Sequence, residues 1–552
     1  MTQRLRFGPH QFIARWNESL QISRTFARGI AATFVGLAML SGCEPAKPGC
    51  PRCDLLVVAA TGEPATLVPP LIGETVGRDI SDNVFERLAY LKPGGVPSDT
   101  AAYTPGLATS WTQVDSVTWR FVLRPEAKWH DGSAVTSDDV TFSFAAYADT
   151  ALGAPGGEAL AGVTVTADGP GAVMIRFPKR GADELLDATY SVRILSKRIW
   201  DPTLRPAWGS DTTLAKLVGS GPFKVVEWRR GQSLRLERVV PVAGGVRQMV
   251  WRFTNDQDAA LNLVLAGEAD LLETAIGPAA RDRASKDTSV VLRPYPSAIY
   301  GYLGFRHADA AGRPHPILAD KGVRQALAAA IDRPSLVATV LGKDAAIPAG
   351  PMSRALWLWS DAAPVPADPA RANQLLDSLG WARTGATRSK AGRQLAIDIM
   401  VPSTSGVRRQ LAEGIQQMWQ GIGVDATITA VDFPVFQQRL TQGKFDAMIT
   451  ASLDEPSPRS LIDQWTKTGW GGSNKVHYGN PTFDSLTTAA VSARTGEQSR
   501  QAWQAAIKAM TEDVAAVFLY SPTNVAVVTK RFASIPIDPF SWLSQAGAWR
   551  AP

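Results

Sequence analysis

The sequence predicts an α/β fold, because strand-like apolar runs alternate with stretches whose apolar residues recur at helical spacing. Short apolar runs at 395–401 and 424–431 are typical of strands. Between them, Leu411, Ile415 and Trp419 lie on one helix face. A strand, helix, strand order predicts a parallel sheet covered by helices. With 552 residues and 45% hydrophobic content, the chain is long enough for several domains of roughly 100–200 residues each.

Other segments of the first half follow the same patterns. The run at 55–60 is continuously apolar and predicts a short strand, and 116–123 alternates as a half-buried strand does. A helix is expected near 79–88. Thr136 at an N-cap with Asp139 three residues later predicts a capping box at the start of another helix.

Two helices of the second half are predicted with their ends. Val323, Ala326 and Ala330 recur at helical spacing and predict a helix over 323–331. Asp368-Pro369 opens a second helix, because proline is favoured in the first turn, and Gly380 closes it.

Composition and charge exclude several classes of protein. Aromatic residues make up 8% and charged residues 20% of the chain, which excludes disorder over most of its length. Beyond residue 42 no apolar run is long enough for a polytopic membrane protein. The net charge is +6, but residues 1–42 hold five arginines against one glutamate. The remainder is nearly neutral and has no concentrated basic run, so no nucleic-acid partner is expected.

The N-terminus predicts secretion and lipid anchoring. Arg24 and Arg28 precede a short apolar stretch at 29–40, which is typical of a secretory signal. Leu40-Ser41-Gly42-Cys43 resembles the bacterial lipobox, which implies cleavage after residue 42 and a lipid on Cys43. The alternative is a buried helix with an incidental cysteine.

The remaining cysteines, Cys50 and Cys53, lie in a proline-rich tether. A disulfide in an oxidising compartment is the favoured interpretation, and two free thiols are the alternative. Three cysteines cannot form a closed four-cysteine zinc site within the chain, and no metal or other cofactor is expected.

The sequence lacks several common catalytic motifs. The five histidines never form His-Glu-x-x-His. Gly219-Ser220-Gly221 lacks the spacing of a nucleophile elbow, and Asp344 after Gly342-Lys343 excludes a Walker A loop. These absences favour a protein that is not an enzyme.

Several segments, taken in order over roughly 55–545, resemble the bacterial extracellular solute-binding proteins of family 5, which bind dipeptides, oligopeptides and nickel for ABC importers. We interpret the matching segments mainly as scaffold, such as a tight loop at Gly219–Pro222. The matching segments are Pro105–Trp111, Phe121–Gly132, Ser137–Val140, Gly219–Phe223, Asp320–Leu327, Ala330–Arg333, Gly380-Trp381, Asn474, Tyr478 and Phe483-Asp484.

The resemblance implies a two-lobed periplasmic binding protein of type II, in the large peptide-binding class, with an extra third domain and a hinge. The hinge is expected near Tyr302–Phe305 and Leu519-Tyr520. The implied divisions are a signal peptide over 1–42, a lipidated tether over 43–53, domain I over 54–83 with 218–302 and 520–552, domain II over 84–217 and domain III over 303–519.

The chain departs from the family where a peptide would bind. Peptide binders of the family show Phe-Asp, then a run ending in Gly-Trp-x-x-Asp, and that Asp binds the terminal ammonium. Here Phe445-Asp446 leads to the next proline through a shorter run without the Trp. Ser452 lies in this run, and Asp454 or Glu455 is the candidate replacement for the missing acid.

Three further side chains are candidates for ligand contact. Arg306 stands where the family usually has Asn, and it either pairs with a ligand carboxylate or lies in solvent. Trp470, among glycines and close to Asn474, either stacks on a ligand or packs in the core. The candidate ligand-binding residues are therefore Ser452, Asp454, Glu455, Trp470, Asn474 and Arg306.

The sequence as a whole predicts a monomeric substrate-binding lipoprotein of an ABC importer. It would be held at the periplasmic face of the inner membrane through Cys43 and would pass a peptide-like solute to a permease without chemistry. The alternatives are a secreted hydrolase, or a protein of the same fold used for sensing or for a metal chelate, an opine or an oligosaccharide.

Overall fold

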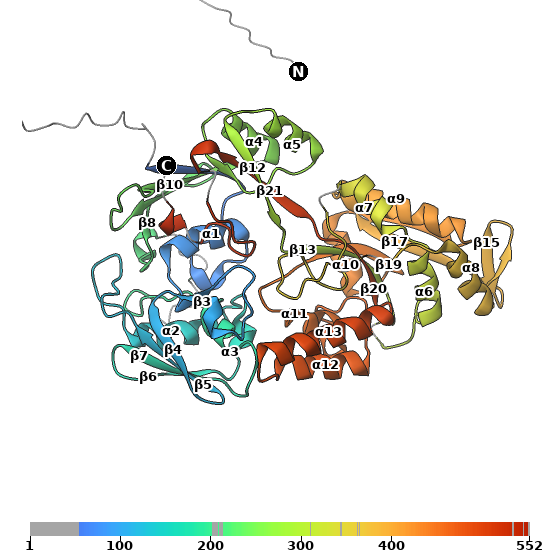
Figure 1. Ribbon diagram of the computed structural model, residues 1–552, viewed down its shortest axis with the longest axis horizontal. Coiled ribbons are helices and arrows are strands. Elements are labelled where there is room, and N and C mark those ends of the chain that lie inside the picture. Colours follow the sequence, from blue (N-terminus) through green and yellow to red (C-terminus); the bar gives the residue numbers. More distant parts are fainter. Residues whose placement is uncertain are drawn as a thin grey trace, which may run out of the picture. The chain divides into compact units, whose positions relative to one another are not determined.

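The computed structural model describes residues 54–200, 208, 213–309, 311–342, 345–361, 363, 365–532, 535–544 and 546–549. The predicted signal peptide, the lipid site at Cys43 and the pair Cys50 and Cys53 lie outside the described residues. Sheets flanked by helices confirm the predicted α/β class (Figure 1). None of the described helices combines the length and apolarity of a membrane span.

The largest sheet has seven strands drawn from separate stretches of the chain, in the order β12-β21-β11-β1-β10-β9-β8. Within it, β1 is parallel to both of its neighbours, β10 and β11. The strands are β1 (Leu55–Thr61), β8 (Phe223–Arg229), β9 (Ser233–Arg238), β10 (Gln248–Thr254), β11 (Leu271–Leu272), β12 (Val290–Pro296) and β21 (Thr523–Thr529).

The position of β1 explains its continuous apolarity. Leu56 and Val58 pack into one core cluster, whereas Val57 and Ala59 pack into another together with α4 (Gln257–Leu265) and α5 (Pro278–Ser285). Because side chains alternate along a strand, a strand covered on both faces needs apolar residues throughout. The strand predicted at 55–60 is confirmed.

A second sheet has five strands in the order β18-β17-β19-β13-β20. Its parallel pair β17 and β18 is joined by α9, which confirms the strand, helix, strand unit expected at 395–431. The strands are β13 (Ile299–Phe305), β17 (Ala396–Pro402), β18 (Asp425–Val431), β19 (Ala447–Leu453) and β20 (Ala516–Tyr520).

Two core clusters lie against this second sheet. In β17, Ile397 and Ile399 pack into one and Met400 packs into the other. The helices of this part are α6 (Lys321–Ala329), α7 (Arg333–Leu341), α8 (Pro369–Ser378), α9 (Gly406–Gly421), α10 (Phe433–Thr441), α11 (Ser460–Trp465), α12 (Pro481–Val491) and α13 (Gly496–Glu512), of which α12 and α13 lie side by side in Figure 1.

Three smaller sheets complete the described fold. The four-stranded one has the order β4-β5-β7-β6 and packs against α2. The strands of the three small sheets are β2 (Ala89–Leu91), β3 (Tyr103–Pro105), β4 (Ala108–Asp115), β5 (Thr118–Leu123), β6 (Thr164–Ala167), β7 (Ala172–Arg176), β14 (Ala382–Thr384), β15 (Thr387–Lys390) and β16 (Arg393–Gln394). The helices of the same part of the chain are α2 (Ser137–Tyr147) and α3 (Glu184–Thr189). Short 3-10 helices lie at Pro69–Leu71, Thr100–Ala102, Gly157–Leu160, Leu214–Lys216, Lys467–Gly469, Lys530–Phe532 and Ala546–Ala548.

Most of the predicted elements are present. The capping box of Thr136 and Asp139 is formed at the start of α2. The strand predicted at 116–123 is β5, and the helices predicted at 323–331 and after Asp368 are α6 and α8. Gly380 has φ +81°, a conformation that glycine adopts without strain.

The helix expected near 79–88 is displaced. The structure has α1 over Thr75–Val84, and Phe85 at its end is extended, with φ −117° and ψ 123°. Phe85 and Leu88 are buried at 1% and 0% exposure, but they reach the core from non-helical backbone. The spacing of Phe85 and Leu88 is the spacing of residues on one helix face. This explains why the sequence predicts the helix later in the chain than the structure has it.

Two connections link the seven-stranded and five-stranded sheets. β12 passes into β13 at Ser297 and Ala298, and β20 passes into β21 at Ser521 and Pro522. The Ser297 N–H donates to the carbonyl of Pro522 at 3.1 Å, so the two connections lie side by side. Tyr302–Phe305 and Leu519-Tyr520, near which the hinge is expected, lie inside β13 and β20. The predicted domain limits stay a prediction.

Candidate functional site

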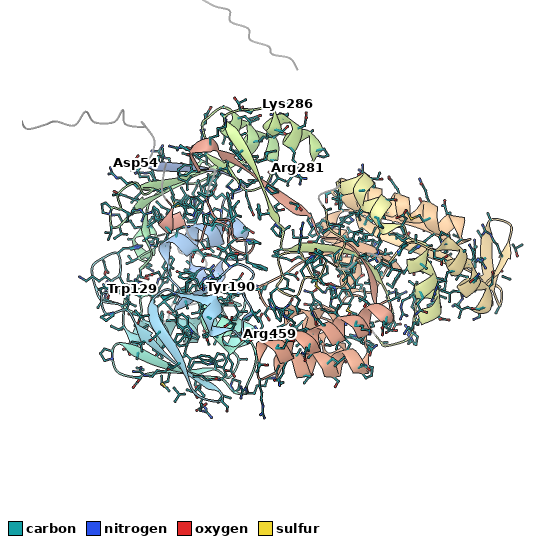
Figure 2. The ribbon with its side chains drawn as sticks, viewed as in Figure 1. Asp54, Trp129, Tyr190, Arg281, Lys286 and Arg459 are labelled. Carbon is teal, nitrogen blue, oxygen red and sulfur yellow. The ribbon has the colours of Figure 1, made fainter. Side chains whose placement is uncertain are left out.

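Two small cavities of about 40 and about 30 Å³ lie where the segment after β19 meets the segments that follow α1 and α3. Both are lined by Arg87, which follows α1, by Tyr190, which follows α3, and by Phe540 near the C-terminus. Glu455 lines the first cavity and Pro456 the second, and both residues directly follow β19. We call these two cavities the central crevice, and Tyr190 is labelled there in Figure 2.

A buried charge cluster forms one wall of the crevice. Asp82 of α1 is 2% exposed and accepts hydrogen bonds from Arg87 at 2.8 and 2.9 Å and from Arg193 at 2.7 Å. Ser541, near the C-terminus, donates to the same carboxylate. Burial raises the pKa of Asp82, but the charges of Arg193 and Arg87 outweigh burial and leave the pKa below its ordinary value.

Arg78 also lines the crevice, one helical turn before Asp82. Its Nη2 donates to Thr75 at 3.5 Å, and its buried Nε has no hydrogen-bond partner among the described residues. No acid of the described residues forms an ion pair with Arg78. A guanidinium in this position can bind a carboxylate that comes from outside the chain.

Glu455 faces this arginine-rich wall from the other side. Its side chain is exposed in the crevice. The surrounding protein atoms and the charge of Glu158 raise the pKa of Glu455, whereas Arg459 and Arg78 act in the opposite direction. The crevice therefore offers a carboxylate on one wall and a guanidinium on the other.

A second polar contact joins the two sides next to the crevice. Arg459 donates to both oxygens of Asp187 in α3, each at 2.6 Å, and Ser457 donates to Asp183. Figure 2 labels Arg459 and Tyr190 in the same part of the molecule, next to α3. Burial raises the pKa of Asp187 to about 7, although the hydrogen bonds from Arg459 lower it.

The residues predicted between Phe445 and the next proline occupy different environments. Ser452 is in β19 opposite Tyr300 of β13. Asp454 is 4% exposed and accepts a hydrogen bond from the Ser353 N–H at 2.5 Å. Of these three predicted residues, only Glu455 lines the central crevice.

Trp470 and Asn474 are brought together in one loop. The Trp470 Nε1–H and the Asn474 amide both donate to the carbonyl of Tyr478, at 2.7 and 2.8 Å. Asn474 is fully buried and also donates to Thr466 at 2.8 Å. These bonds hold the loop, and neither residue lines the central crevice.

Arg306 lies at the end of β13 and not in open solvent. Its Nε donates to the carbonyl of Phe445 at 2.5 Å, and its Nη2 is 3.8 Å from Asp446. His315 Nε2 is 3.0 Å from the same carboxylate. Within the described residues no group of three or more histidine, cysteine, aspartate or glutamate residues is placed to hold a metal ion. The ligand roles of all six predicted residues stay predictions.

Sequence reasoning missed the charged wall of the crevice. Arg78 and Asp82 lie four residues apart in α1, on the side of the helix that carries buried residues. Two opposite charges at this spacing could have indicated a charged wall. Arg193 pairs with Asp82 across 111 positions, and no local pattern could have indicated that contact.

Known proteins share this fold. The model of the family described as "Bacterial extracellular solute-binding proteins, family 5 Middle" matches residues 102–473. The oligopeptide-binding protein AppA of Bacillus subtilis is 24% identical over 511 residues, which cover 90% of this chain and 91% of AppA.

Solved structures of other proteins share this fold as well. AppA from Bacillus subtilis in complex with a nonapeptide has a TM-score of 0.71 at 23% identity and covers 90% of this chain and 99% of its own. NikA from Brucella suis in complex with Fe(III)-EDTA has a TM-score of 0.76 at 19% identity, with 90% and 100% covered. These likenesses confirm the predicted fold class, a two-lobed periplasmic binding protein. The family match covers more than half of the chain, which therefore belongs to the bacterial extracellular solute-binding proteins of family 5.

Proposed function

We propose that the protein is the substrate-binding lipoprotein of an ABC importer. It captures a peptide or peptide-like solute between its two lobes and delivers it to a membrane permease, with no catalysis. Family membership supports a solute-binding role, and relatives such as AppA are named as oligopeptide-binding proteins.

One structural observation carries the proposal. Two connections, at Ser297-Ala298 and Ser521-Pro522, join the two large sheets and are hydrogen-bonded to each other. Because the two connections are short and adjacent, changes at a few backbone dihedrals can rotate one side against the other. A crevice lined from both sides then closes around a solute.

The walls of the crevice suit a zwitterionic solute. Glu455 offers a carboxylate to an ammonium group, and Arg78 offers a guanidinium to a carboxylate. In peptide binders of the family an Asp binds the terminal ammonium. We assign that role here to Glu455 rather than to Asp454, because the Asp454 carboxylate is buried against Ser353. Glu455→Ala should then weaken peptide binding at least tenfold, while Asp454→Ala should change it less if its fold is retained.

The membrane attachment rests on the sequence. We propose that Cys43 carries the lipid, holds the mature chain at the periplasmic side of the inner membrane and leaves it monomeric. Labelling with a fatty acid should mark the wild type and leave Cys43→Ser unmarked. A variant that is marked as strongly as the wild type would contradict the assignment.

The first experiment on function compares native with denaturing mass spectrometry of the mature protein carrying Cys43→Ser. A mass that leaves on denaturation would identify the captured solute, and adding that solute should raise the melting temperature. Reproducible turnover of ester, peptide or glycan substrates by the pure protein would contradict a binding role without catalysis.

A further inference from the structure

A separate cavity of about 310 Å³ lies at the C-terminal ends of β1 and β11, next to the first half of α1. We call it the acceptor cavity. Trp251 and Trp542 contribute apolar walls. Its volume is several times the roughly 30 Å³ that one water molecule occupies in the liquid, so it has room for the end of a side chain.

The polar groups of the acceptor cavity are mainly hydrogen-bond acceptors. Asp79 Oδ1, Gln257 Oε1 and Thr61 Oγ1 line it, are buried and have no hydrogen-bond partner within the described residues. Asp79 as a whole is 2% exposed, and its other oxygen accepts from Trp542 Nε1 at 2.6 Å. Leaving a buried acceptor unpaired costs about 1–3 kcal/mol. Three such atoms around one cavity point to a donor from outside the chain.

Carboxyl groups line the cavity. Glu273 lines it beside Asp79, and no described residue donates a hydrogen bond to the Glu273 carboxylate. Burial raises the pKa values of both Asp79 and Glu273, and the charge of Glu273 adds to the effect on Asp79. Arg78 lowers both pKa values but forms no ion pair with either acid. Two carboxylates so placed favour a cation between them.

The other acids of the lining are already engaged. Glu63 accepts from Arg230 at 3.2 Å and from Trp228 at 3.1 Å, and Glu74 accepts from the Ala65 N–H at 2.9 Å. Glu74 is also the N-cap residue of α1, where its negative charge is attracted by the partial positive charge of the helix N-terminus. The available acceptors are therefore those of Asp79, Glu273, Gln257 and Thr61.

We propose that the acceptor cavity binds a cationic organic group of the captured solute, an alkylammonium or a guanidinium. This inference rests on the proposed function, since it names the chemistry that the solute carries. Asp79 and Glu273 balance the charge, Gln257 and Thr61 accept further hydrogen bonds, and the two tryptophans surround the apolar stem. An organic cation fits better than a metal ion, because no third acid, histidine or cysteine of the described residues completes a metal site.

The cavity is connected electrostatically to the central crevice through α1. Asp79 lines the cavity and the preceding residue, Arg78, lines the crevice. A solute whose carboxylate pairs with Arg78 can therefore place a cationic group in the acceptor cavity. In a peptide whose terminal ammonium pairs with Glu455, that group is a lysine or arginine side chain.

The test uses the mature protein carrying Cys43→Ser and two probes, a random pentapeptide mixture with free N-termini and the same mixture with acetylated N-termini. Retained peptides are identified by mass spectrometry. Glu273→Gln and Asp79→Asn are compared with Glu268→Gln, which removes an exposed carboxylate paired with Arg252 on the same sheet. Asn at position 79 can still accept from Trp542, and melting curves check that each variant folds.

We expect the wild type to retain cation-bearing peptides in preference to neutral ones, and Glu273→Gln and Asp79→Asn each to lower that preference by roughly tenfold to a hundredfold. The preference should be lost equally among free and acetylated peptides, because the bound group is a basic side chain. Loss only among free peptides would place the terminal ammonium in the acceptor cavity and overturn this assignment. Peptides retained with the same preference by wild type and both variants would overturn the cation site and leave the receptor function standing. Failure of the wild type to retain any peptide would overturn both.

Discussion

Arg459 and Asp187 form a bidentate ion pair, with both N–H···O distances at 2.6 Å, between the segment after β19 and α3. The residues are 272 positions apart in the sequence, and α3 follows a small sheet that is distinct from the one containing β19. Asp187 is nearly buried and Arg459 is about one-third exposed. The pair therefore links the two sides that flank the central crevice.

Breaking this pair should favour the open arrangement. Arg459→Ala removes both hydrogen bonds, and because Arg459 is partly exposed, we expect a loss of about 1–2 kcal/mol, a factor of roughly 5–30 in the ratio of closed to open protein. Small-angle X-ray scattering of the ligand-free variant should show a larger radius of gyration. Arg313→Ala, which removes an exposed pair with Asp309, is the control, and equal radii for both variants would contradict the prediction.

Asp454 should make stability depend on pH. Burial raises its pKa to about 7 from an ordinary value of 3.8, despite the hydrogen bonds from Ser353. Between these values the folded state holds a proton that the unfolded state has lost, so its contribution to stability falls as pH rises, by up to about 1.4 kcal/mol per pH unit, and levels off above about pH 7. Urea unfolding from pH 4 to 8 should show a shallower decline for Asp454→Asn. Superimposable profiles of variant and wild type would refute this.

Asp82→Asn should destabilise the fold strongly. It leaves Arg87 and Arg193 buried without their shared carboxylate, which costs about 3–5 kcal/mol. The urea midpoint should fall at an unchanged slope. Asp138→Asn removes an exposed partner of Lys197 and should change stability by less than about 1 kcal/mol. A similar midpoint for the two variants would mean that the buried cluster adds no stability.

Gly219→Ala should also destabilise, for a steric reason. A Cβ at this position would lie 1.8 Å from the carbonyl oxygen of Val84, so the loop must move away from α1, at a cost of about 1–3 kcal/mol. At Gly171 a Cβ meets nothing within 4 Å, and Gly171→Ala should be nearly neutral. Calorimetric melting temperatures compare the two, and equal values would show that the loop yields without strain.

Local patterns in the sequence predicted much of the secondary structure. The capping box of α2, the strand, helix, strand unit around α9 and the continuously apolar β1 depend on residues close together in the chain, so periodicity reveals them. The helix was predicted too late for the same reason, because Phe85 and Leu88 have a helical spacing on backbone that is not helical. Periodicity reports which residues are buried, and two backbone conformations can bury the same residues.

Local patterns and ordered motifs were enough to predict the α/β class, most of the helices and strands, and the family. Where the sheets are joined and which charges meet depends on the tertiary structure. The contacts of Asp82 with Arg193, of Arg459 with Asp187, and of Asp79 with Glu273 in one cavity join residues more than 100 positions apart. Such contacts depend on how whole sheets pack, and the free energy of that packing is summed over many distant side chains. No window along the chain contains that information.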